Sequence, residues 1–184
     1  MGGRSGRDAS TILEHATHEA GHYVMGRVMH EDHGDLFSIS SFNYLSIEVD
    51  KSGGSGGRVS ASRVKYDDES DISKEAWAHY LLGGIAAQIH LIRTSIAALG
   101  GNEEEFPELV LAQGLVVTDG EDDLETLQKF WPDIIWEDFF PKVIARVKHE
   151  WTRIQRVAAA LAKKKRLTGD EALIVDGVQA PAGG

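Results

Sequence analysis

Two histidines four residues apart, His18 and His22, constrain the fold of this chain more than any other feature. They lie within a row of apolar residues that recurs in steps of four, at Ile12, Ala16, Ala20, Val24 and Val28. This period predicts an amphipathic helix from about residue 11 to residue 29. Thr11 and Glu14 have the spacing of a capping box at its start. On such a helix both imidazoles project from one face.

The segment from His18 to His22 reads His-Glu-x-x-His, with Glu19 directly after the first histidine. Two imidazoles on one helical face can both reach a single Zn²⁺ ion at about 2.0–2.1 Å. Glu19 would lie beside the open coordination position, where a carboxylate can act as a general base on water. We therefore expect His18 and His22 to be metal ligands and Glu19 to be catalytic. His15, one turn earlier, fits a surface histidine better than a supporting residue.

A catalytic zinc ion usually has three protein ligands, so a third is required. The chain has no cysteine, which leaves histidine, aspartate or glutamate. Met25 and Val28 occupy positions where a metzincin would have Gly and His. Glu48 has the distance of a thermolysin-like ligand but lies in a predicted strand. The carboxylates of residues 121–123 open a short predicted helix, where they are ligand candidates or simply favourable partners of the helix dipole.

Further hydrophobic patterns predict a predominantly helical α+β domain with a small, mostly antiparallel sheet. In the second helix, Gly83 and Gly84 interrupt a nearly continuous apolar surface, which indicates close approach of another backbone. The long last helix contains Pro141, where we expect a bend. The expected elements are two short strands in 36–49, a strand at 58–66, and helices at 73–99, 103–114, 121–130 and 134–166.

Length and charge limit the organisation and the partners. The 184 residues suit one domain, expected over 9–175, with a flexible start at 1–8 and a flexible tail at 176–184. A net charge of −10 argues against nucleic-acid binding. The chain has no run of about 20 apolar residues and no secretory signal, so we expect no membrane span and a cytoplasmic protein.

Several segments, in order, resemble the FtsH-type zinc peptidases, and together they cover about residues 11–173. The first is the His-Glu-x-x-His segment. The second, Leu82-Gly83-Gly84-Ile85-Ala86-Ala87-Gln88, is similar to the family's Leu-Gly-Gly-Arg-Ala-Ala-Glu. The third, residues 118–125, resembles Thr-Gly-Ala-Ser-Asn-Asp-Leu-Glu, and residues 161–171 resemble the family's closing helix and turn. The resemblance implies a zincin-like helical domain in which Asp123 is the third zinc ligand.

The resemblance also has departures. Ile85 and Gln88 replace the family's Arg and Glu, residues 91–117 are expected to be an insertion, and the ATPase module and membrane segments are missing. We therefore expect a zinc-dependent endopeptidase that hydrolyses flexible or unfolded protein chains without hydrolysing ATP itself. A separate ATPase or unfoldase and a homo-oligomer are possible partners. A substrate strand would add to a sheet edge within residues 36–66.

Two other functions remain open from the sequence. One is a zinc-binding regulatory module or pseudo-peptidase that binds a partner protein and cuts one specific target or nothing. The other is a compact His-Glu-x-x-His peptidase of the kind linked to phage repressors, which resembles this chain in the first helix only.

Overall fold

The computed structural model describes residues 4–34, 39–49, 55–63, 71–118 and 121–177. The described part of the chain is a predominantly helical α+β domain with one small antiparallel sheet, which confirms the expected fold class. Its elements are α1 (Arg4–His33), β1 (Ile39–Val49), β2 (Ser55–Arg63), α2 (Asp71–Ala98), η2 (Glu103–Glu105), α3 (Glu108–Thr118), α4 (Glu121–Phe130), α5 (Trp136–His149), α6 (Trp151–Lys164), β3 (Arg166–Thr168) and α7 (Gly169–Asp176).

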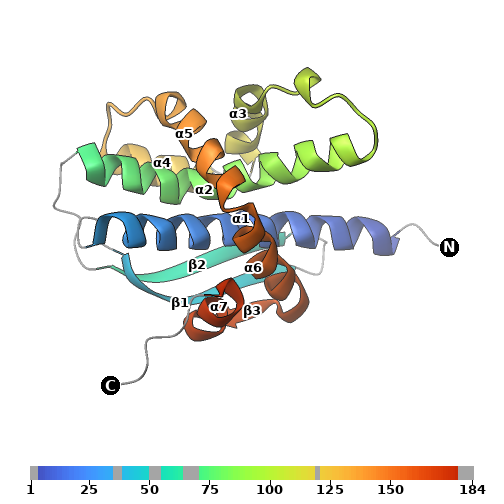
Figure 1. Ribbon diagram of the computed structural model, residues 1–184, viewed down its shortest axis with the longest axis horizontal. Coiled ribbons are helices and arrows are strands. Elements are labelled where there is room, and N and C mark those ends of the chain that lie inside the picture. The colour runs from blue at the N-terminus through green and yellow to red at the C-terminus, as the bar shows by residue number, and fades with distance from the viewer. Residues whose placement is uncertain (1–3, 35–38, 50–54, 64–70, 119–120, 178–184) are drawn as a thin grey trace.

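The helices and the sheet are stacked in layers (Figure 1). α1 lies across the sheet and packs on β1 and β2, and α2 runs alongside α1 on the side away from the sheet. α3 lies on the side of α2 away from α1, whereas α4 and α5 overlap α2 in this view and pack on it (Figure 1). α1 and α2 are therefore the central pair, and they contribute most of the buried apolar side chains.

Glycines let α1 and α2 approach each other closely. A Cβ atom added at Gly21 would overlap the backbone oxygen of Gly83. A Cβ atom at Gly83 would lie 2.7 Å from Cγ of Met25 and 3.0 Å from the oxygen of Gly21. This contact confirms the close approach expected from the glycine pair of the second helix.

The sheet has the order β2-β1-β3, with both pairings antiparallel. The prediction of two short strands in 36–49 is wrong, because residues 39–49 form the single strand β1. Register shifts occur between Ile39 and Ser41 and between Phe42 and Tyr44. Such irregularities displace the alternation of inward and outward side chains, which made one strand look like two. β2 begins at Ser55, within the Gly/Ser-rich segment, and ends at Arg63; residues 64–66 of the expected strand lie outside the described residues.

Both ends of the domain differ from the expected boundaries. α1 begins at Arg4, five residues before the expected start of the domain. At the other end, α7 runs to Asp176 and closes at Gly177, whose φ is +84°. The carboxylate of Asp176 is buried and accepts two hydrogen bonds from Arg153, at 2.7 and 2.6 Å. Asp176 is therefore part of the folded domain, and residues 178–184 lie outside the described residues.

The helix expected over 134–166 is two helices, and the chain turns at Glu150 rather than at Pro141. α5 packs on α2, whereas α6 packs on α1. One straight helix could not cover both surfaces. The helix expected over 103–114 is also divided, into η2 and α3, because Pro107 precedes the first turn of α3.

By length and hydropathy alone, the Ile72–Ala98 segment of α2 could cross a membrane. Half of its most apolar window is buried inside the protein, and a core helix shows the same pattern, so this is weak evidence for a membrane span.

Candidate metal centre

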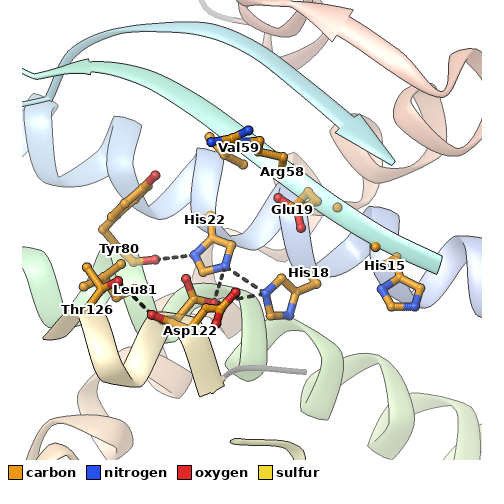
Figure 2. Close-up of a pocket in the computed structure, with 13 residues that line it drawn as sticks. His15, His18, Glu19, His22, Arg58, Val59, Tyr80, Leu81, Asp122 and Thr126 are labelled. Carbon is orange, nitrogen blue, oxygen red and sulfur yellow. Dashed lines mark hydrogen bonds and ion pairs between the residues drawn. The ribbon is translucent and has the colours of Figure 1, made fainter. Parts of the chain in front are cut away.

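Three side chains converge between α1, α2 and α4. His18 and His22 come from consecutive turns of α1, and Asp123 comes from the first turn of α4. The two Nε2 atoms are 2.8 Å apart. Oδ2 of Asp123 lies 3.4 Å from Nε2 of His18 and 3.1 Å from Nε2 of His22. In Figure 2 both imidazoles point toward each other and toward the start of α4.

The second nitrogen of each imidazole is held by an acceptor on α2. Nδ1 of His18 lies 2.9 Å from Oε1 of Gln88, and Nδ1 of His22 lies 2.8 Å from the backbone oxygen of Tyr80. A carbonyl oxygen can only accept a hydrogen bond, so each Nδ1 must carry the hydrogen and donate it. This assignment leaves the lone pair of each Nε2 directed at the other imidazole and at Asp123.

The convergence of three acceptors requires a positive charge among them, either a proton or a metal ion. Four-coordinate Zn²⁺ with ligands at about 2.0–2.1 Å places its ligand atoms about 3.3 Å apart, close to the separations observed here. His18, His22 and Asp123 can therefore hold a metal ion.

Gly84 of α2 forms one wall of this group. A Cβ atom added there would lie 2.5 Å from Nε2 of His22 and 2.6 Å from Nε2 of His18. Any side chain at this position would thus occupy the space that faces the two metal-binding nitrogens. The absence of a side chain at Gly84 keeps that space open.

The charges in the site are strongly coupled. Burial by itself lowers the pKa of His22, but the charge of Asp123 and its hydrogen bond outweigh burial and raise the pKa to about 9. For Asp123, burial raises the pKa, while the two histidines together hold it well below its usual range. In the metal-free protein the pair is therefore an imidazolium and a carboxylate at neutral pH.

Glu19 lies between α1 and β2, beside the metal-binding group (Figure 2). Its side chain is buried, with 6% exposure. Burial is the largest influence on the carboxyl group and raises its pKa, although His22 and His18 act in the opposite direction. A Cβ atom added at Gly57 of β2 would overlap this carboxyl group, so glycine at residue 57 gives Glu19 its space under the strand.

A cavity of about 550 Å³ opens onto the site. Its lining combines the metal-binding group and Glu19 with a stretch of β2 and parts of α2 and α4. His15 also lines this cavity, on the same side of α1 as His18 (Figure 2). His15 is half-buried and borders the cavity, so whether it supports the site or is simply a surface histidine stays a prediction.

The structure brings together all four residues expected at the site: His18, Glu19, His22 and Asp123. Sequence reasoning missed the role of Gln88, which it treated only as a departure from a resemblance. A signal was present, because Gln88 is a polar residue on an otherwise apolar stretch of a core helix and is only 3% exposed. The carbonyl of Tyr80 left no signal, since any residue can supply a backbone oxygen.

Comparison with protein-family models gives no match for this chain, and comparison with curated proteins gives none either.

Proposed function

We propose that this protein is a zinc-dependent endopeptidase of the FtsH-like type, acting on flexible or unfolded protein chains. One observation carries the proposal. Two imidazole nitrogens and a carboxylate oxygen converge within 3.4 Å of one another, and a buried glutamate adjoins them at an open cavity. This combination matches the parts that a metal-dependent hydrolase needs.

Zinc is favoured by the donor set. Two imidazoles and one carboxylate suit Zn²⁺, whereas Mg²⁺ and Ca²⁺ prefer oxygen ligands throughout. Gln88 and the carbonyl of Tyr80 orient the imidazoles from behind, as hydrogen-bond acceptors commonly do at zinc sites. The donor set thus supports zinc over Mg²⁺ and Ca²⁺.

The family assignment is supported by where the resembling segments lie. The His-Glu-x-x-His segment supplies two members of the group, and the third segment supplies Asp123. Between them, the Gly-Gly segment supplies the open wall at Gly84 and the acceptor Gln88. Segments that are far apart in the sequence thus meet around one site.

In this proposal the zinc ion would polarise the scissile carbonyl and acidify water near Glu19. Glu19 accepts a proton from the attacking water and then gives it to the leaving amine. Its raised pKa suits both roles, because a carboxylate with an ordinary pKa is a poor proton donor near neutral pH. The absence of a side chain at Gly57 leaves room for this carboxyl group.

An extended substrate fits beside β2. This strand is the last in the order β2-β1-β3, so among the described residues its outer edge carries no neighbouring strand. Residues 56–59 of β2 line the cavity next to Glu19. A peptide that added to this edge would pass the site as an extended chain. Such binding requires an unfolded segment, which is why a separate unfoldase remains part of the proposal.

The test is cleavage of an unfolded protein such as casein, with zinc content measured on the same samples. We expect wild type and Glu19→Gln to bind zinc equally and only wild type to cleave. Cleavage by Glu19→Gln at the wild-type rate would refute the assignment of the base. Zinc in both proteins without cleavage by either would refute a general endopeptidase and favour the regulatory module.

A further inference from the structure

The segment that follows α2 exposes an unusual amount of apolar surface. Four large hydrophobic residues are exposed here: Leu99 by 89%, Phe106 by 39%, Leu109 by 39% and Val110 by 62%. Only four others are exposed anywhere else in the described residues. We call Leu109 and Val110, which lie on α3, together with the preceding Phe106 the α3 face. Contiguous exposed apolar surface usually marks an interaction site.

The α3 face is not simply a loosely attached helix. Ala112 on the opposite side of α3 is fully buried, and Leu111 and Leu115 pack against the core. Arg93 of α2 pairs with Glu108 at the start of α3, and Lys148 of α5 lies 2.6 Å from the same carboxylate. The inner side of the segment is therefore held in place while its apolar outer side faces solvent.

The exposed residues are spaced for contact with another helix. Leu109 and Val110 lie next to each other in the first turn of α3 and are both exposed, and Phe106 precedes this helix by two residues. Gly114 lies one turn after Val110, and no atom lies within 4 Å of a Cβ atom added there. Two exposed apolar side chains followed by an open glycine leave room for a second helix to pack against α3.

The charge beside the face selects the partner. Glu104 and Glu105 are exposed and adjoin Phe106, and neither forms an ion pair with another described residue. An anionic membrane surface would be repelled by these carboxylates. A second copy of α3 would offer these carboxylates no basic partner, because residues 108–118 contain neither Lys nor Arg. A helix with Lys or Arg beside its apolar row would instead complement them.

We propose that the α3 face binds an amphipathic helix of a partner protein, with its apolar row against Leu109 and Val110 and its basic residues beside Glu104 and Glu105. The site lies on the far side of α2 from the sheet (Figure 1). Because it does not use the metal-binding group, it does not depend on the proposed peptidase activity.

Two synthetic helical peptides of about 18 residues, or five turns, test the proposal. Both carry leucines in one row, but one has lysines and the other has glutamates on the polar side. Binding to the full chain is measured by calorimetry. We expect the lysine peptide to bind and the glutamate peptide not to bind.

Matched variants locate the contact. Val110→Gln should weaken binding at least 10-fold, whereas Ile135→Gln, at a residue with similar exposure of 59%, should not change it. Glu104→Lys with Glu105→Lys should weaken binding to a similar extent, whereas Asp133→Lys with Asp138→Lys should leave it intact. Circular dichroism confirms that each variant is folded.

Three results would overturn the proposal. The first is absence of binding by the lysine peptide, and the second is equal binding of both peptides. The third is a loss with Ile135→Gln as large as that with Val110→Gln. If sedimentation instead shows a dimer of the chain that Val110→Gln abolishes, the face is an interface between copies and the proposed partner is wrong.

Discussion

A methyl group added at residue 84, by Gly84→Ala, should damage the metal site more than a methyl group added at any other residue. The added Cβ atom would lie 2.5 Å from Nε2 of His22 and 2.6 Å from Nε2 of His18, whereas ordinary contact begins at 3.4 Å. The backbone of α2 cannot retreat easily, because Gly83 already packs against Gly21 and Met25 of α1. The imidazoles would therefore have to move by about 0.8–0.9 Å.

That displacement is large compared with the tolerance of a metal site, where ligand distances hold to about ±0.2 Å. The methyl group also fills space in front of both nitrogens. We expect Gly84→Ala to weaken zinc binding at least about 100-fold, which corresponds to about 2.7 kcal/mol. Overpacking of the helix pair should lower the free energy of unfolding of the metal-free protein by about 1–3 kcal/mol.

The assay is competition for zinc between the purified metal-free protein and a chromogenic chelator. Gly114→Ala is the matched control, because Gly114 is also helical but an added Cβ atom meets nothing within 4 Å. This control should bind zinc as wild type does and gain about 0.5–1 kcal/mol in stability. If folded Gly84→Ala bound zinc as tightly as Gly114→Ala, the geometry argued for the site would be wrong.

Three further predictions follow from the surroundings of the site. Gly57→Ala should push the carboxyl group of Glu19 aside and reduce casein cleavage at least about 100-fold, with zinc binding retained. Gly56→Ala should leave cleavage unchanged, since an added Cβ atom there meets nothing within 4 Å. Equal activity of the two variants would contradict this prediction. Gln88→Leu should weaken zinc binding about 10- to 100-fold in the chelator assay, because Nδ1 of His18 loses its hydrogen-bond acceptor. Gln88→Glu, which keeps an acceptor, should preserve zinc binding. Unchanged zinc affinity of Gln88→Leu would show that Gln88 does not orient His18. Zinc binding at pH 7 should release about one proton, because His22, with a pKa of about 9, is protonated in the metal-free protein. The apparent zinc affinity should therefore rise about tenfold per pH unit until that pKa is reached. Calorimetry in buffers with different ionisation enthalpies counts the released protons, and a count of zero would show that His22 is already neutral.

The local part of the site could be predicted from the sequence because it depends on one helix. The helical period alone places His18 and His22 on one face with Glu19 beside them. The pair Gly83 and Gly84 likewise indicated a close helix contact, since glycines are costly in a helix interior unless packing requires them.

The long-range part could not be derived in the same way. Asp123 lies on a separate helix, and no local pattern tells which of several carboxylates will reach the histidines. Only the resemblance selected it over its neighbours, and the structure shows that packing of α4 on α2 brings it there. Strand β1 and the turn at Glu150 were misread for a related reason. The register shifts of β1 are set by tertiary contacts. The turn at Glu150 is also set by tertiary contacts, because α5 packs on α2 and α6 packs on α1.

The central claim is that His18, His22 and Asp123 bind one zinc ion. Its most direct test is elemental analysis after dialysis against zinc, for wild type, Asp123→Ala and the neighbouring control Asp122→Ala. Asp122 is exposed and is not part of the three-residue group. We predict about one zinc ion per chain in wild type and Asp122→Ala and little zinc in Asp123→Ala. A wild-type protein without zinc, or equal zinc in the two variants, would contradict the account.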